Sequence, residues 1–315
     1  MISLFPPSAK DTASALWIDL YNPTDEEVQK VSTALKLSVP QRAELEEIES
    51  SSRLQAENGQ IQMSLPVSAH GEDEAPTPVG FILSKERLVT IRFTEMRAFE
   101  AAAHQCTKKH DPLTTSYEIF ATIIEGMIDF GADMLEEIAN ELNDVSKTVF
   151  RRYKRTRQHN IARSNKRMRE TLLAVGMAGE RLSQIRESIL GLQRAVPYAV
   201  DKAKSWMGDV ISERLKTAGT DLVSLSDFEV HLSNKVQFLL DAVLGFINTE
   251  QNDIFKVLTI ASVVGIPPTF LASMWGMNFE TIGEYHWHYG YAFALTMIGI
   301  SIVLPVIWFK WRGWW

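Results

Sequence analysis

Two long apolar segments near the C-terminus constrain the fold more than any other feature of this chain. Residues 257–274 and 289–309 contain no charged side chain. Each segment is about as long as a bilayer-spanning helix, which needs ~20 apolar residues at a rise of 1.5 Å per residue. Trp308, Trp311, Trp314 and Trp315 crowd at the end of the second segment, as interfacial aromatics do. The pattern favours a membrane hairpin over the alternative of two buried core helices.

Cations flanking the two segments predict their orientation. Lys256 precedes the first segment, and Lys310 and Arg312 follow the second. The connection between them carries Glu280 and Glu284 but no Lys or Arg. By the positive-inside rule, both termini are expected in the cytoplasm and the connection on the outer side.

Composition indicates that most of the chain lies in water and excludes several functions. The 315 residues include 39 acidic and 32 basic side chains, a formal net charge of −7, and a general nucleic-acid binder is usually basic. The single Cys106 cannot form an intramolecular disulfide, and no cleaved signal peptide is expected. The sequence has no Walker loop, dinucleotide fingerprint, nucleophile elbow or zinc-protease motif. We therefore expect neither an enzyme nor a cofactor.

Residues 1–114 are predicted to form a small α/β domain. Thr24 followed by Glu27 is a capping box that opens a helix ending near Leu35. A second helix is expected at residues 40–49. Alternating or β-branched apolar runs predict strands at residues 15–20, 61–67, 79–83 and 88–92.

From residue 115 onward the sequence favours long helices. Residues 115–221 are predicted to form a helical hairpin with connecting helices, the main segments being 117–154 and 161–193. A third helix, from residue 222 to 275, has no clear stop before the apolar segment and would be about 80 Å long. We expect residues 222–256 to form its cytosolic stalk and residues 257–276 the first membrane span. An outer loop at 277–288, a second span at 289–309 and a cytoplasmic tail at 310–315 would follow.

A dense basic run lies at the predicted tip of the helical hairpin. A solvated hairpin tip is the simpler interpretation, and contact with anionic lipid or with an acidic neighbouring subunit is the alternative. The run contains one aromatic residue, Tyr153, which does not favour nucleic-acid binding. It comprises Lys147, Arg151, Arg152, Lys154, Arg155, Arg157, Arg163, Lys166, Arg167 and Arg169.

One face of the long third helix carries polar residues interrupted by an apolar collar. Carboxylates and amides before the span would attract a divalent cation, and a short apolar constriction can stop conduction by dewetting. The alternative is that the hydroxyls only bond to carbonyls of their own helix. Two spans cannot enclose a pore, so a channel requires a homo-oligomer. The polar set before the span is Asp241, Asn248 and Asn252, the collar is Phe255, Leu258 and Ile266, and the polar set within the span is Ser262, Thr269 and Ser273.

Several motifs in this region resemble the CorA family of divalent-cation channels. The most specific is Gly276-Met277-Asn278 placed between two C-terminal spans. Trp17-Ile18-Asp19-Leu20 and Leu88-Val89-Thr90-Ile91-Arg92 are similar to cytosolic strands of the family, so the resemblance covers most of the chain. Further matches are Lys256-Val257-Leu258-Thr259, Pro267-Pro268-Thr269-Phe270, Phe279-Glu280, Trp287, Tyr289-Gly290-Tyr291 and Phe309-Lys310-Trp311.

The resemblance implies a homopentameric funnel in the inner membrane, with a cytosolic α/β/α domain, long stalk helices and a pore lined by the first span. Asn278, between Met277 and an outer loop containing Glu280 and Glu284, would form a ring at the outer mouth. Mg²⁺ releases its water reluctantly, and neutral amide oxygens can hold the hydrated ion without trapping it. The implied cargo is Mg²⁺, with Co²⁺ or Ni²⁺ as further cargo, moving down its electrochemical gradient.

Two rival functions stay open at this stage. His286 and His288 could hold a softer metal such as Zn²⁺, although exposure to water is the preferred interpretation of these side chains. The zinc-transporting ZntB branch of the family usually has Val or Ile where this chain has Met277. A membrane-anchored helical scaffold that conducts nothing is the rival from a different class.

Overall fold

The computed structural model describes residues 1–9, 11–47, 49, 53–68, 76–110, 112–153, 161–277 and 287–314, without the side chains of 151–153 and 161–167. The chain divides into two compact units. The first comprises Met1–Arg157 and Arg169–Leu240, and the second comprises Gln158–Met168 and Asp241–Trp315.

A six-stranded mixed sheet forms the centre of the first unit, with strand order β1-β2-β6-β5-β4-β3. Only the β2–β6 pair is parallel, with Trp17 opposite Leu88, and the other neighbouring strands run antiparallel. The strands are β1 (Ile2–Phe5), β2 (Trp17–Tyr21), β3 (Leu54–Glu57), β4 (Gln60–Val67), β5 (Thr77–Ser84) and β6 (Leu88–Arg92).

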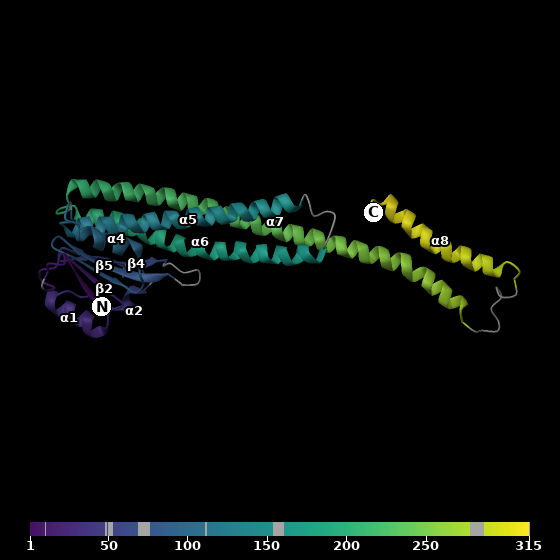
Figure 1. Ribbon diagram of the computed structural model, residues 1–315, viewed down its shortest axis with the longest axis horizontal. Coiled ribbons are helices and arrows are strands. Elements are labelled where there is room, and N and C mark those ends of the chain that lie inside the picture. Colours follow the sequence, from purple (N-terminus) through teal and green to yellow (C-terminus); the bar gives the residue numbers. More distant parts are fainter. Residues whose placement is uncertain are drawn as a thin grey trace. The chain divides into compact units, whose positions relative to one another are not determined.

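Helices cover both faces of this sheet and make a three-layer α/β/α arrangement (Figure 1). Alternation along β2 sends Ile18 toward the face of α1 (Asp25–Leu35) and α2 (Arg42–Leu45), and Trp17 toward the face of α4 (Arg97–Cys106) and α5 (Ser116–Tyr153). The larger cluster, on the second face, contains Phe81, whose ring contacts those of Phe99 and Phe120. Apolar burial on two faces therefore fixes the register of the sheet.

A polar network lies within this core and joins β2 to β6. The indole Nε1 of Trp17 donates to Thr90 Oγ1 at 2.9 Å, and Thr90 Oγ1 donates to Asp19 Oδ1 at 2.7 Å. Arg92 donates to Asp19 Oδ2 from Nε and from its terminal nitrogen, each at 3.0 Å. The guanidinium also lies over the rings of Tyr21 and Phe99. A buried carboxylate is thus paired and hydrogen-bonded, as burial of charge requires.

Four long helices complete the chain. They are α5 (Ser116–Tyr153), α6 (Ile161–Ala203), α7 (Asp209–Trp275) and α8 (Gly290–Trp311). Side chains of α5 pair with both of its neighbours within the first unit. Arg214 of α7 binds both carboxylate oxygens of Glu125, at 3.0 and 2.6 Å, and Arg181 of α6 lies 3.3 Å from Glu137 and 2.9 Å from Glu141.

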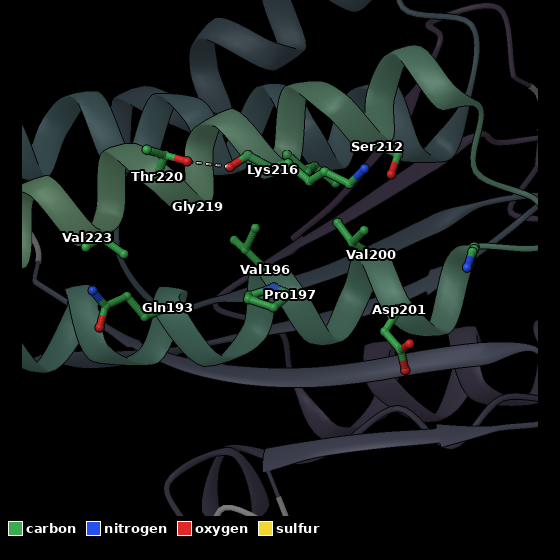
Figure 2. Close-up of a pocket in the computed structure, with 12 residues that line it drawn as sticks. Gln193, Val196, Pro197, Val200, Asp201, Ser212, Lys216, Gly219, Thr220 and Val223 are labelled. Carbon is green, nitrogen blue, oxygen red and sulfur yellow. Dashed lines mark hydrogen bonds between the residues drawn. The ribbon is translucent and has the colours of Figure 1, made fainter.

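A groove lies between the end of α6 and the start of α7 (Figure 2). Its volume is about 850 Å³. Val196, Val200 and Leu215 contribute apolar surface, and Asp201 and Lys216 contribute charge. At the far end of the groove Gln193 Nε2 donates to the carbonyl of Leu222 at 3.0 Å, which ties the two helices together.

Most elements agree with the sequence, and the differences have physical causes. The capping box at Thr24 and Glu27 is present in both directions. The helix expected at 40–49 is limited to α2, which forms one short turn. The third long helix begins at Asp209 rather than near residue 222, since Arg214, Leu215 and Leu222 all pack within the helical layer. Elements β1, β3 and α4 were not predicted.

Candidate cation path

The membrane-length part of α7 has two distinct faces. Its half-buried positions include Ile260, Val264 and Leu271, spaced four and seven residues apart, so they share one face of the helix. Trp275 extends this row, and its ring centroid lies 6.4 Å from that of Phe293 on α8, at an interplanar angle of 73°. This face is therefore the one directed toward α8.

The residues predicted to line a path lie on the other side of the helix. At about 100° per residue, Leu258, Ser262 and Thr269 fall roughly opposite Ile260 and Val264. The helix continues through the Pro267-Pro268 pair without a break. The sequence-derived stripe is therefore directed away from the contact with α8.

The collar residues are exposed in the single chain. Phe255, Leu258 and Ile266 have exposed fractions of 63, 60 and 65 %. Exposure of three large apolar side chains on one face is unusual for a surface in water. Their face needs a partner, either lipid or another copy of the chain.

The hydroxyl residues within the span differ in hydrogen bonding and in exposure. Thr269 Oγ1 donates to the carbonyl of Gly265 at 2.8 Å, which is the helix-internal bond that the alternative interpretation expects. Its two lone pairs can still accept. Thr269 and Ser273 are exposed, whereas Ser262 is half-buried.

Before the span, the polar residues Asp241, Asn248 and Asn252 are all exposed along α7. Lys256 bonds to Asp253 at 3.0 Å, one turn back on the same helix. Asp241 is the carboxylate among the predicted path residues before the span. Contact of Asp241, Asn248 and Asn252 with an ion stays a prediction.

The described part of the signature ends the helix. The N–H of Gly276 donates to the carbonyl of Ala272 at 3.0 Å. A Cβ added at Gly276 would lie 3.2 Å from that same oxygen, so a small residue suits the turn. Met277 is about half exposed. After the loop, the ring of Trp287 lies 5.5 Å from that of Phe293, so Phe293 contacts aromatic residues on both sides of the loop.

Several predicted site residues lie outside the described residues, namely Asn278, Glu280, Glu284 and His286. The nearby His288 is exposed and its ring lies 4.9 Å from that of Tyr289. Within the described ranges, no three His, Cys, Asp or Glu side chains are grouped to hold a metal. The outer-mouth assignments thus remain predictions.

The first unit contains carboxylates that the sequence analysis did not single out. The pKa of Asp129 is raised by burial and then by the negative charges of Asp133, Glu125 and Asp221. Glu125, Asp129 and Asp133 are spaced four residues apart on α5, and this spacing was the sequence signal that could have revealed the cluster. Burial also raises the pKa of Glu229, against a smaller opposite influence from Arg186, whose Nε lies 3.8 Å away.

Known proteins match this chain over nearly its whole length. A model of the family "CorA-like Mg2+ transporter protein" matches residues 12–311. The magnesium transport protein CorA of Pectobacterium atrosepticum is 31% identical over 306 residues, which cover 96% of this chain and 93% of that protein. The corresponding protein of Yersinia pseudotuberculosis is 32% identical over 306 residues, with the same coverage.

Solved structures agree on the fold. The complete structure of the CorA magnesium transporter from Methanocaldococcus jannaschii matches with a TM-score of 0.75 at 18% identity, over 96% of this chain and 92% of that one. The cytoplasmic domain of ZntB from Vibrio parahaemolyticus matches with a TM-score of 0.54 at 13% identity, over 74% of this chain and 88% of that domain.

The α/β/α unit, the long helices and two apolar helices define a membrane protein with a large N-terminal domain. Both α7 and α8 are long and apolar enough to cross a bilayer, and 0% and 6% of their apolar windows are buried. Buried core helices, the alternative interpretation, would not leave these windows exposed. This chain belongs to the CorA-like family, and the predicted fold class is confirmed.

Proposed function

We propose that this chain is a homopentameric channel of the inner membrane for hydrated divalent cations, mainly Mg²⁺, driven by the electrochemical gradient. Co²⁺ and Ni²⁺ are proposed as secondary cargo. Both termini would lie in the cytoplasm. The observation that carries the proposal is the stripe on α7, which combines polar groups and an exposed apolar collar on the face directed away from α8.

Within the proposed path, each set of residues has a different task. Exposed Asp241, Asn248 and Asn252 would raise the local concentration of divalent cations at the cytoplasmic neck. The collar would close the path by dewetting when its side chains approach the axis. The domain boundaries at 114, 256, 276, 288 and 309 are part of this proposal, and the boundary expected at 221 moves to the start of α7 at Asp209. They separate cytosolic domain, hairpin, stalk, first span, outer loop, second span and tail.

At the outer end, Gly276 and Met277 would present Asn278 as a ring of amides, one from each copy. Amide oxygens are hard neutral ligands, which suit Mg²⁺ and its water shell. Glu280 and Glu284 would attract cations to this ring. His286 and His288 are assigned no metal in the Mg²⁺ mechanism and become relevant only if Zn²⁺ is the cargo.

The test is ion entry into proteoliposomes that contain a Mg²⁺-responsive dye. Asn278→Ala should reduce Mg²⁺ entry at least tenfold, while Asn234→Ala, on the cytosolic part of α7, should leave it unchanged. Mg²⁺ entry that survives Asn278→Ala would contradict the outer-mouth assignment. Entry of Zn²⁺ alone would favour the ZntB-like alternative, and no entry of either ion from an assembled oligomer would favour the scaffold.

The collar has its own test in the same vesicles. Leu258→Ser should increase basal Mg²⁺ entry several-fold, because a hydroxyl keeps water in the constriction. The matched control is Val264→Ser on the face directed toward α8, which should not leak. Equal leakage in both variants would show that general disruption of the helix, rather than wetting of a path, is the cause.

A further inference from the structure

The end of α8 is a preformed turn rather than a fraying helix terminus. Gly313 has φ +71°, the left-handed conformation that glycine adopts without strain. The N–H of Gly313 donates to the carbonyl of Lys310 at 3.2 Å, and the N–H of Trp314 donates to that of Phe309 at 3.1 Å. These two bonds are the Schellman arrangement. They turn the chain back over the last helical turn.

Aromatic side chains complete this turn. The ring of Trp314 lies 5.4 Å from that of Phe309, and Phe309 is 1% exposed. The contact joins the same two positions that make the longer backbone bond, as is usual for this motif. The position of residues 308–314 is thus fixed by bonds and packing within the chain itself.

An exposed face of α8 leads into this turn. Ile300, Leu304, Ile307 and Trp311 are all large, exposed and spaced by three or four residues, so they form one apolar column. Trp311 is 84% exposed. At the end of the column, the guanidinium of Arg312 lies 5.2 Å over the ring of Trp308. Among the residues that the structure describes, no carboxylate is within ion-pair distance of Arg312.

We propose that this column and Arg312 form a binding site for an anionic phospholipid, with an acyl chain along the column and the phosphate on the guanidinium. A guanidinium stacked on an aromatic ring keeps its N–H donors in a fixed fork, which matches a phosphate. Trp308 and Trp311 suit the boundary between acyl chains and headgroups. The site rests on α8 spanning a membrane and does not require the chain to conduct ions.

Lipid is favoured over a second copy of the chain by the change in character along the face. The column is apolar from Ile300 to Ile307 and becomes aromatic and cationic at Trp311 and Arg312. That order matches a phospholipid from tail to headgroup. A second copy placed on the column would bury the Arg312 guanidinium against apolar groups unless it supplied a carboxylate.

The test compares two substitutions that change the net charge equally. Lys310 and Arg312 flank Trp311 at about 100° on either side, and it is Arg312 whose guanidinium lies over the ring of Trp308. Purified full-length oligomer of the parent, Arg312→Gln and Lys310→Gln would be mixed with phosphatidylglycerol or phosphatidylcholine, and bound lipid counted by native mass spectrometry. The proposal expects Arg312→Gln to reduce retained phosphatidylglycerol at least fivefold and Lys310→Gln to reduce it less than twofold.

Gly313→Val supplies a second, independent arm, because a β-branched residue resists the left-handed conformation. It should also lower retention while leaving both cations in place. Equal losses of retained lipid from Lys310→Gln and Arg312→Gln would show that general surface charge, and not a specific site at Arg312, holds the lipid. Unchanged lipid retention combined with dissociation of the oligomer in Arg312→Gln would assign the face to a second copy, and either result overturns the proposal.

Discussion

The two units of this chain differ in whether their large apolar side chains are buried or exposed. In the first unit, large side chains such as Trp17, Phe81 and Phe120 are fully buried between the sheet and its helices. In the second unit, Phe255, Leu258 and Ile266 are more than half exposed, and the apolar window of α8 is 6% buried. The first unit thus builds a large buried core within a single chain. The second unit leaves these side chains to be covered by lipid or, in the proposed channel, by other copies of the chain.

The same substitution should therefore have different consequences in the two units. Phe81→Ala removes a fully buried ring in contact with Phe99 and Phe120, and should cost about 3–5 kcal/mol of unfolding free energy. Phe255→Ala removes an exposed ring and should change ion entry more than stability. Chemical denaturation followed by tryptophan fluorescence, combined with flux, separates the two. Similar losses of stability in both variants would break the comparison.

Removal of one partner in the buried polar network should have the next largest effect. Asp19→Asn leaves the guanidinium of Arg92, which is largely buried, without its counter-charge. Breaking such a buried pair costs about 3–5 kcal/mol at most, and we expect the lower end because Thr94 and two rings still contact Arg92. The control is Asp144→Asn, whose exposed partner Lys147 is 2.8 Å away. Equal loss in the control would argue against a role for burial.

A smaller effect is expected at the start of α1. Thr24→Ala removes the hydroxyl that accepts from the N–H of Glu27 at 3.3 Å. Loss of an N-cap side chain costs about 1 kcal/mol. Thr24→Ser keeps the oxygen and should recover most of the loss in thermal melting. If the serine variant melts like the alanine variant, the packing of the threonine methyl group, and not the cap, is responsible.

The smallest effect concerns pH. Burial raises the pKa of Glu229 above its ordinary value of 4.5, so the folded chain holds this proton where the unfolded chain releases it. The stabilising contribution is then present at low pH and is lost as pH rises through the folded pKa. Glu229→Gln should remove that dependence, and the melting temperature of the parent should fall relative to the variant as pH rises above the ordinary value of 4.5.

A control for this comparison is Glu187→Gln on the exposed surface of α6. If the parent instead gains stability over Glu229→Gln as pH rises, the pair with Arg186 outweighs burial and the assigned direction is wrong.

Features determined by local sequence were predictable, and features determined by packing were not. The capping box of α1 depends on two residues three positions apart, and the apolar spans depend on uninterrupted composition. Strand β1 is four residues long and exists because it pairs with β2. Helix α4 starts at Arg97 after the N-cap residue Met96, which makes no side-chain cap bond, so the helix lacks the usual start signal. Both β1 and α4 therefore depend on strand pairing and packing in the folded chain rather than on a local sequence signal.

The candidate path was predictable to the same degree. Periodicity placed Leu258, Ser262 and Thr269 on one face, but no periodicity could reveal that this face is directed away from α8. That relation depends on the contact of Trp275 with Phe293. Likewise, periodicity could not show that Asp129 on α5 lies near Asp221 on α7, because the two residues are far apart in sequence.

The central claim, that the α7 stripe lines a water-filled path, can be tested by cysteine accessibility. The native Cys106 is buried, and burial raises the pKa of its thiol to about 11, so background labelling should be low. Ser262→Cys, Thr269→Cys and Ser273→Cys would be compared with Val264→Cys and Leu271→Cys in reconstituted vesicles treated with a charged, membrane-impermeant thiol reagent. The account predicts that the reagent blocks Mg²⁺ entry in the three stripe variants and spares the two others. Block of Val264→Cys and Leu271→Cys, with the stripe variants unaffected, would contradict it.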